Sequence, residues 1–145
     1  MNNSKVHDLY YKMLRIRLVE EKIAKLYAEQ EMRCPVHLSI GQEAIAVGTC
    51  AHLQKKDLVL SSHRAHAHYL AKGGDLKRLI SELYGKSTGC AMGKGGSMHL
   101  IDLESGFFAA VPIVGSIIPI AVGVSWSFKM KKIRNITITY IIERS

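Results

Sequence analysis

Four basic or imidazole side chains stand close together near the middle of the chain: His63, Arg64, His66 and His68. Neutral histidine is the commonest metal ligand, so a metal site is one interpretation. A zinc site, however, needs three or four converging ligands, and no carboxylate stands near this cluster in sequence. Arg64 favours a different chemistry, because its planar, permanently charged guanidinium matches the oxygens of a phosphate group. We therefore expect the cluster to face a phosphate, with core packing of His68 as the alternative.

A glycine-rich segment over residues 85–96 is the second candidate for ligand binding. It fits neither familiar phosphate-binding pattern. A Walker loop has four residues between its first glycine and the Gly-Lys pair, whereas only three separate Gly89 from Gly93 and Lys94, and a glycine follows the lysine. The dinucleotide-binding pattern fails because Met98 occupies the place of its last glycine. The segment therefore predicts only a loop whose backbone lies close to a ligand or to protein.

The segment from Ser105 to Phe128 carries no charged residue. It is long enough for a membrane-spanning helix, and Lys129 to Arg134 would be its basic flank. Prolines, glycines and small residues interrupt it, so we favour an element packed inside a protein and keep a membrane-anchored basic protein as the lesser alternative. Within the segment, Pro112 to Gly115 predicts a rigid turn before a helix that starts at Ser116, and such a turn can aim backbone groups at a flat ring.

The elements that position these residues begin with a long amphipathic helix. Apolar residues recur every three or four positions from Ser4 onward, which predicts one buried helix face. Cys34 and Pro35 should end this helix, because proline cannot continue the hydrogen-bond ladder. We therefore expect an N-terminal helical segment over residues 4–34, followed by a loop around His37. The predicted face consists of Leu9, Met13, Ile16, Val19, Ile23 and Leu26.

Shorter elements follow. Ser39 is placed to cap a helix over residues 42–52. Asp57 to Ser62 predicts a short strand. Asp75 should cap a second well-marked helix, which Gly85 should end in a left-handed conformation.

The last element that the pattern predicts is a strand over residues 135–142. Its β-branched and aromatic residues are typical of a buried strand in a parallel sheet. Open α/β sheets bind their ligands at the carboxyl ends of such strands. A ligand site at that edge is therefore the expectation.

Composition excludes several classes of protein. Hydrophobic residues make up 48% and charged residues 22% of the 145 residues, the balance of a globular chain near the size of one domain. The net charge of +8 could indicate nucleic-acid binding, but no base-stacking or zinc-finger pattern accompanies it. We expect no nucleic acid and interpret the excess charge as a basic face, which could serve an anionic cofactor.

Cysteine usage and the amino terminus indicate the compartment. Cys34, Cys50 and Cys90 are odd in number and contain no CxxC pair, which argues against a disulfide framework. No apolar signal-peptide core follows Met1. We therefore expect a cytoplasmic protein.

Six motifs occur together in an order that identifies a family. The chain resembles the amino-terminal portion of the α subunit of thiamine-diphosphate-dependent 2-oxoacid dehydrogenases, the E1 components, a group that includes pyruvate, branched-chain 2-oxoacid and acetoin dehydrogenases. The resemblance covers nearly all of residues 1–145. The motifs are HLSIGQEA at 37–44, SHRAH at 62–66, AKGGD at 71–75, ELYGKSTGC at 82–90, GKGGSMH at 93–99 and IVG at 113–115.

The resemblance implies an α/β thiamine-diphosphate-binding fold, a parallel sheet flanked by helices that is incomplete at the C-terminus. It implies that Arg64 and His63 contact the diphosphate of the cofactor. Pro112 and Val114 should present backbone to the aminopyrimidine ring. His37 should face the substrate or the reacting carbon, so that His37 and His63 are the candidate catalytic residues, acting as donors or acids.

The implied reaction is decarboxylation of a 2-oxoacid, or cleavage of acetoin, with thiamine diphosphate and magnesium. The acyl group then passes to the lipoyl group of an E2 component. An E1 β subunit completes each active site in a heterotetramer. Which small 2-oxoacid or acetoin-like molecule is the substrate stays open, because part of the pocket lies outside this chain.

Two departures from the family pattern bear on activity. Pro112 stands where many relatives have glycine, which removes one amide donor. The Gly-Asp-Gly motif and later asparagine that hold magnesium should follow the strand at 135–142, where this chain reads Glu143-Arg144-Ser145. We therefore expect no metal ligand in this chain, weak diphosphate binding and no activity of the chain alone. A non-catalytic fragment that pairs with a β-like subunit is the alternative function.

Overall fold

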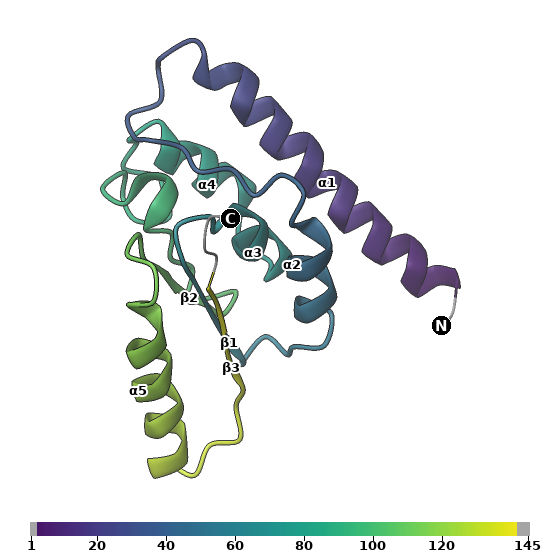
Figure 1. Ribbon diagram of the computed structural model, residues 1–145, viewed down its shortest axis with the longest axis vertical. Coiled ribbons are helices and arrows are strands. Elements are labelled where there is room, and N and C mark those ends of the chain that lie inside the picture. Colours follow the sequence, from purple (N-terminus) through teal and green to yellow (C-terminus); the bar gives the residue numbers. More distant parts are fainter. Residues whose placement is uncertain (1–2, 142–145) are drawn as a thin grey trace.

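The computed structural model describes residues 3–141, in which helices and short strands alternate (Figure 1). The order is α1 (Asn3–Tyr27), α2 (Glu43–Cys50), β1 (Leu58–Ser61), α3 (His66–Ala71), α4 (Leu76–Leu83), the short 3₁₀ helix η1 (Gly96–Met98), β2 (Phe107–Ala110), α5 (Ile117–Met130) and β3 (Thr137–Tyr140).

The three strands form one parallel sheet in the order β2-β1-β3. Ser61 at the end of β1 pairs with Ala110 of β2 on one side and with Tyr140 of β3 on the other. Parallel neighbours need crossover connections, and α3, α4 and α5 provide them. The predicted fold class, a parallel sheet flanked by helices, is therefore confirmed.

Alternation of side chains along β1 explains why both faces of the sheet are covered. Leu60 points to one face, where it packs with Ile117 and Ala121 of α5. Val59 points to the other face and belongs to the main core with residues of α1 to α4. Successive residues of a strand face opposite sides, so a short apolar run such as Leu58–Ser61 requires helices on both. Figure 1 shows α5 on one side of the sheet and the remaining helices on the other.

The predicted apolar face of α1 is confirmed, but the predicted end of the helix is wrong. Ile16 and Ile23 are fully buried, and the other four residues of the face pack at the edges of the core. The helix ends at Tyr27 rather than near Cys34, and Gln30 adopts a left-handed φ of 58°. The chain turns there because Met32 is buried against Leu83 in α4.

Ser39 caps a different helix from the one predicted. The first residue before α2, Gln42, makes no side-chain cap. The Ser39 hydroxyl instead accepts the backbone N–H of Ala67 in the first turn of α3, at 3.4 Å. The predictions for α4 are confirmed, since Asp75 accepts the N–H of Arg78 at 2.8 Å and Gly85 has a φ of +65°.

The uncharged segment divides into a strand, a turn and a helix. Strand β2 was not predicted, because two aromatic and two small residues give no clear alternation. The predicted helix start at Ser116 is confirmed, and α5 spans 14 residues. Among residues 3–141, no helix combines the length and the apolar character needed to cross a membrane.

The final strand is shorter than expected but parallel as predicted. It covers Thr137–Tyr140, and Ile142 at the end of the predicted range lies outside the described residues. Tyr140 is buried and stacks on His68, with 3.7 Å between ring centroids and 12° between planes. This contact ties the end of β3 to α3.

Candidate functional site

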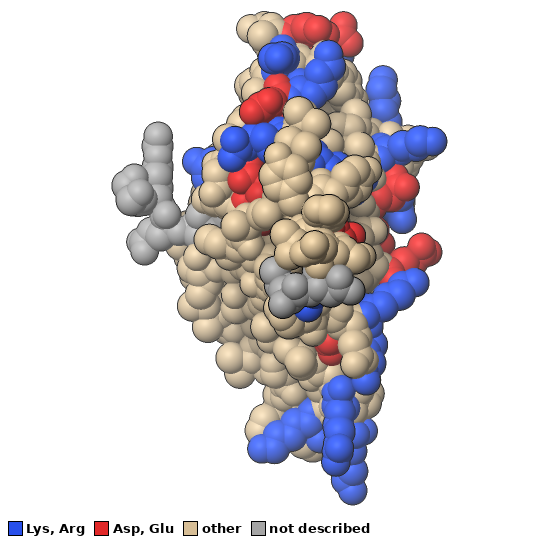
Figure 2. Space-filling view, turned by 90° about the vertical axis from the view of Figure 1, so that its right-hand side faces the viewer, with Lys and Arg blue, Asp and Glu red and all other residues tan. Residues whose placement is uncertain are grey.

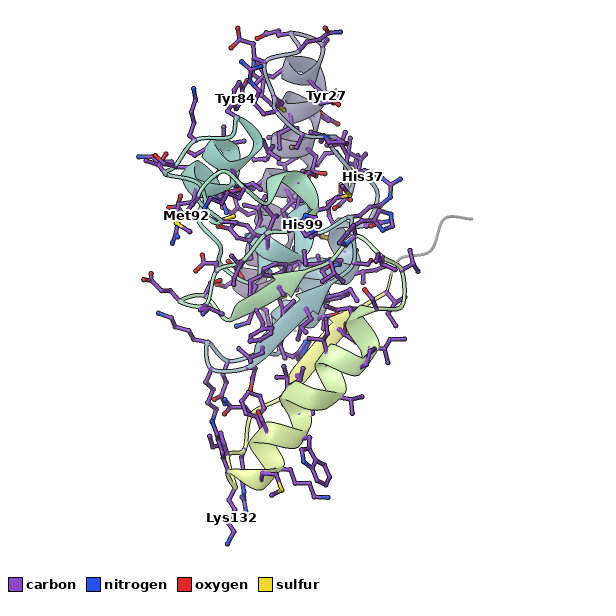
Figure 3. All side chains as sticks on the ribbon, turned by 90° about the vertical axis from the view of Figure 1, so that its left-hand side faces the viewer. Tyr27, His37, Tyr84, Met92, His99 and Lys132 are labelled. Atoms are coloured by element: carbon purple, nitrogen blue, oxygen red, sulfur yellow. The ribbon has the colours of Figure 1, made fainter. Side chains whose placement is uncertain are left out.

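The carboxyl ends of β1 and β2 bring the predicted site residues to one edge of the sheet. His63 and Arg64 follow β1 directly, and the turn at Pro112–Gly115 follows β2. The two strand ends are neighbours, because the N–H of Val111 donates to the carbonyl of Ser61 at 3.1 Å. In Figure 3, His37 lies on the side toward which the strand arrows point. The edge predicted from strand polarity is thus the one on which the candidate residues gather.

His37 and His63 are in direct contact, although they belong to different segments. Their imidazole rings meet edge to face with 5.4 Å between centroids and an interplanar angle of 89°. The Nδ1 atom of each ring is buried and has no hydrogen-bond partner among residues 3–141. Buried polar atoms are normally paired, so an unpaired ring nitrogen on each of two contacting imidazoles marks this pair as a candidate ligand site.

The environment of His63 favours the neutral form of its ring. Burial lowers the pKa of His63, and the nearby His37 and Arg64 lower that pKa further. A neutral imidazole carries one donor and one acceptor, so it can bind either a phosphate oxygen or a protonated group.

Arg64 is tied at both ends to the loop that carries His37. Its Nη1 donates to the carbonyl of Leu38, and its own carbonyl accepts the Ser39 hydroxyl at 3.2 Å. A guanidinium has five N–H donors, and the bond to Leu38 uses only one. The guanidinium is therefore oriented by its bond to Leu38. Because the Arg64 side chain is partly exposed, an anion can reach it.

The turn after β2 is open to solvent. Val114 is 45% exposed, and Gly115 has a φ of +83° with no atom near its Cα on the side where a Cβ would stand. The N–H and the hydroxyl of Ser116 both donate to the carbonyl of Ile113 and close the turn. Contact of Pro112 and Val114 with an aromatic ring stays a prediction.

The predicted cluster of His63, Arg64, His66 and His68 is not a single site, because His66 and His68 are buried in the core. His68 is buried, bonds the hydroxyl of Ser61 at 2.8 Å, and its pKa is lowered to about 3 by burial. His66 is also fully buried, between the carboxylate of Glu20 and the hydroxyl of Ser97. Only His63 and Arg64 remain for a ligand. Glu20 was missed, because a single acidic residue on an apolar helix face gives no signal of its partner.

The backbone of the glycine-rich loop lies close to protein, which is one of the two predicted alternatives. Its partner is the carboxylate of Glu82. Both oxygens of Glu82 are used, and burial raises its pKa while the loop amides outweigh this effect and lower it overall. The segment therefore wraps a side chain of its own protein, and glycine is required where the loop passes Glu82 and Cys34. The N–H donors belong to Ala91, Gly93, Gly95 and Gly96, at 2.7 to 3.0 Å.

The basic run does not serve this edge of the sheet. Lys129 to Arg134 are exposed and precede β3, so they lie at the amino edge, opposite His63. Figure 2 shows basic side chains gathered at the end of the molecule formed by this turn, and Figure 3 places Lys132 there. This run is therefore not the part of the basic surface that could serve a cofactor bound at the candidate site.

The described residues suit an anionic diphosphate better than a metal ion. Arg64 offers charged donors, and its sequence neighbour His63 contacts His37, each of these two rings having an unpaired Nδ1. Within residues 3–141, no three His, Cys, Asp or Glu side chains are placed to hold a metal ion. Glu143, Arg144 and Ser145 lie outside the described residues.

Comparison with known proteins shows the family to which the chain belongs. Residues 11–143 match the family described as dehydrogenase E1 component. Over 132 residues the chain is 44% identical to the α subunit of an acetoin:2,6-dichlorophenolindophenol oxidoreductase from Bacillus subtilis, which covers 91% of this chain and 40% of that protein. It is 40% identical over 129 residues to the pyruvate dehydrogenase E1 component subunit α of Rickettsia bellii, with 89% of this chain and 40% of the relative covered.

A plant relative gives the same result. The chain is 38% identical over 130 residues to a mitochondrial pyruvate dehydrogenase E1 component subunit α-1 from Arabidopsis thaliana, which covers 90% of this chain and 33% of the relative. The chain thus spans about two fifths or less of the length of these relatives. The match extends over most of the chain, including the segments that carry His37, Arg64 and Val114, and the chain belongs to the dehydrogenase E1 component family.

Proposed function

We propose that this chain is the part of an E1 α subunit that binds the diphosphate end of thiamine diphosphate. The observation that carries the proposal is the meeting of His37, His63 and Arg64 at the carboxyl edge of a parallel sheet, with two ring nitrogens lacking partners. This edge is where open α/β sheets bind their ligands. The family match supports the same cofactor.

Each residue has a defined role in this proposal. Arg64 binds diphosphate oxygens, because its guanidinium is already aimed by the carbonyl of Leu38. His63 adds a neutral donor beside it. Pro112 and Val114, in the exposed turn after β2, provide backbone and an apolar surface for the aminopyrimidine ring.

Thiamine diphosphate, when bound, supplies the nucleophilic carbon and the electron sink for decarboxylation. The protein then has to stabilise charge on the substrate oxygen and exclude water. His37 is placed for the first task, since its Nδ1 is unpaired beside His63. It would donate a proton or a hydrogen bond to the carbonyl oxygen of a 2-oxoacid or of acetoin.

The assembled enzyme that we propose is cytoplasmic and contains an E1 β subunit and a lipoyl-bearing E2 component. Three free cysteines, Cys34, Cys50 and Cys90, agree with a reducing compartment. Magnesium would accompany the diphosphate, with ligands other than the described side chains.

Calorimetric titration tests the proposal. Thiamine diphosphate should bind the chain more strongly than thiamine, which lacks the phosphates. Arg64→Ala should weaken binding of the diphosphate by about tenfold or more, because a charge-assisted bond is lost. Arg134→Ala, which removes an exposed arginine of the basic run, should leave binding unchanged. Equal loss in both variants would show non-specific attraction of charge and would refute the site.

A second function, pairing with a β-like subunit without catalysis, is favoured by the apolar surface of the outer helices. Val122 and Trp126 of α5 and Leu18 of α1 are more than half exposed. Large exposed apolar groups on neighbouring turns of a helix mark protein contacts. Co-purification with an E1 β subunit that persists in Arg64→Ala, together with absent cofactor binding in the unaltered chain, would favour this function.

A further inference from the structure

A buried row of hydrogen bonds connects α1, α3 and η1 beneath the candidate site. Glu20 of α1 and His66 of α3 are both 0% exposed, and Ser97 of η1 is 1% exposed. The Nδ1 of His66 lies 2.7 Å from Oε1 of Glu20, and its Nε2 lies 2.8 Å from Oγ of Ser97. Three separate elements therefore meet through side chains that no solvent reaches.

The chemistry of the partners sets the direction of these bonds. Oε2 of Glu20 accepts the backbone N–H of Ser39. A carboxylate offers only acceptors, so we assign the proton of the bond between Glu20 and His66 to Nδ1 of His66. The Nε2 of His66 can then accept the hydroxyl proton of Ser97. The Oγ of Ser97 in turn accepts the backbone N–H of His37 at 3.1 Å. Every donor and acceptor in the row is satisfied.

The row ends on two amides of the same short loop. The N–H groups of His37 and Ser39 are its outer donors, and Leu38 lies between them. The carbonyl of Leu38 accepts from the guanidinium of Arg64, and the hydroxyl of Ser39 donates to the carbonyl of Arg64. Fixing this loop therefore fixes the backbone of His37 and the fork of Arg64 together.

We infer that Glu20, His66 and Ser97 are positioning residues for the candidate site, holding the loop 37–39 so that His37 and Arg64 keep their places at the sheet edge. The inference rests on the proposed function, because it takes this edge of the sheet to be the cofactor-binding site. The order Ser-His-Glu matches that of nucleophilic triads, but complete burial keeps any substrate from the Ser97 hydroxyl. Its role is mechanical.

Burial makes such a network effective. An unpaired buried polar group is costly, so each bond strongly favours one arrangement of the loop. Loss of one member should loosen residues 37–39 locally, with a smaller effect on distant parts of the core. His63 reports this loosening, because contact with His37 and Arg64 helps to keep its pKa below 6.5.

Nuclear magnetic resonance of the chain without cofactor tests the inference. Ring nitrogen shifts should show that Nδ1 of His66 carries a proton. In Ser97→Ala, the amide of His37 should exchange with solvent about tenfold faster, and the titration midpoint of His63 should rise toward 6.5. Ser87→Ala, an exposed serine of the neighbouring loop, is the matched control and should change neither.

The amide of Leu79, bonded to the carbonyl of Asp75 in α4, reports on global opening. Faster exchange of His37 and Leu79 in parallel would mean general destabilisation and would overturn the inference. An unprotonated Nδ1 of His66, or an unaltered His37 amide in Ser97→Ala, would overturn it equally. Glu20→Gln offers a second test with little change of shape, and the Ser39 amide should exchange faster there.

These measurements contain no cofactor, so they are independent of the proposed function. Failure of thiamine diphosphate to bind the unaltered chain would refute the proposed function and leave the network intact. Normal binding combined with unaltered His37 and His63 in Ser97→Ala would refute the network alone.

Discussion

The imidazole of His37 meets that of His63 edge to face, with 5.4 Å between ring centroids and both Nδ1 atoms unpaired. One ring belongs to the loop before α2 and the other to the loop after β1. The contact brings two segments of the chain to one edge of the sheet, next to Arg64. It leaves two polar atoms without a hydrogen-bond partner among residues 3–141.

Arg64→Gln should raise the pKa of His63. Burial is the main cause of its lowered pKa, and the positive charge of Arg64 adds to it, so removing that charge should move the midpoint toward 6.5 without reaching it. Titration of the histidine ring signals by nuclear magnetic resonance measures this shift. A midpoint that stays where it was would mean that the guanidinium lies too far from the ring to affect it.

His68 should make the chain less stable in mild acid. The pKa of His68 is about 3 in the folded chain and 6.5 ordinarily. Between these two pH values the unfolded chain therefore binds a proton at His68, and the folded chain does not. The free energy of unfolding should therefore fall as the pH falls below 6.5, by up to about 1.4 kcal/mol per pH unit from this group. His68→Phe keeps a ring against Tyr140 and should give a flatter slope between pH 7 and pH 5 in urea unfolding. An identical slope would contradict burial of a neutral His68.

Glu82→Gln should destabilise the fold by about 2–3 kcal/mol, because the amide NH2 that replaces one carboxylate oxygen cannot accept from the two loop N–H groups bonded there. Glu104→Gln, at an exposed position, is the control. The pKa of Glu82 is lowered, so its contribution is complete above 4.5 and is lost as the pH falls below that value. Urea unfolding should show a smaller acid dependence in the variant, and equal stability of both variants would contradict the role of Glu82.

Two glycines should respond to alanine in opposite directions. Gly96 has a φ of +61°, and a Cβ there would stand 2.6 Å from the Cβ of Cys34, so Gly96→Ala should cost about 2 kcal/mol or more. Gly48 lies inside α2 with open space around it, and Gly48→Ala should gain about 0.5–1 kcal/mol. Thermal unfolding of both variants checks the pair. Stabilisation by Gly96→Ala would show that the loop does not pack on Cys34 as described.

Periodic and capping signals predicted much of the fold because their causes are local. The apolar face of α1, the Asp75 cap and the left-handed Gly85 follow from neighbours within a few residues of each other. Strand β2 was not predicted, because Phe107–Ala110 has no alternation of apolar and polar side chains that would distinguish it from the apolar helix after it. The end of α1 was misplaced because burial of Met32 depends on a distant helix.

Only those site residues could be predicted whose side-chain type alone indicates what they bind. Arg64 was proposed from the phosphate affinity of its guanidinium within a cluster of histidines, the resemblance to E1 α subunits singled out His63 from that cluster, and strand polarity predicted the edge. The roles of His66 and His68 could not be separated in sequence, since both depend on partners from elsewhere in the chain, Glu20 and Tyr140. Ser39 was assigned to the nearest helix, while its hydroxyl contacts a later one.

The position of bound thiamine diphosphate on the chain is the most direct test of the central claim. Backbone and side-chain resonances should be followed during titration to concentrations on the order of millimolar, with and without magnesium. The account predicts shifts at His37, His63, Arg64 and Val114 that disappear in Arg64→Ala. Shifts confined to the basic run Lys129 to Arg134, with the edge residues unaffected, would contradict it.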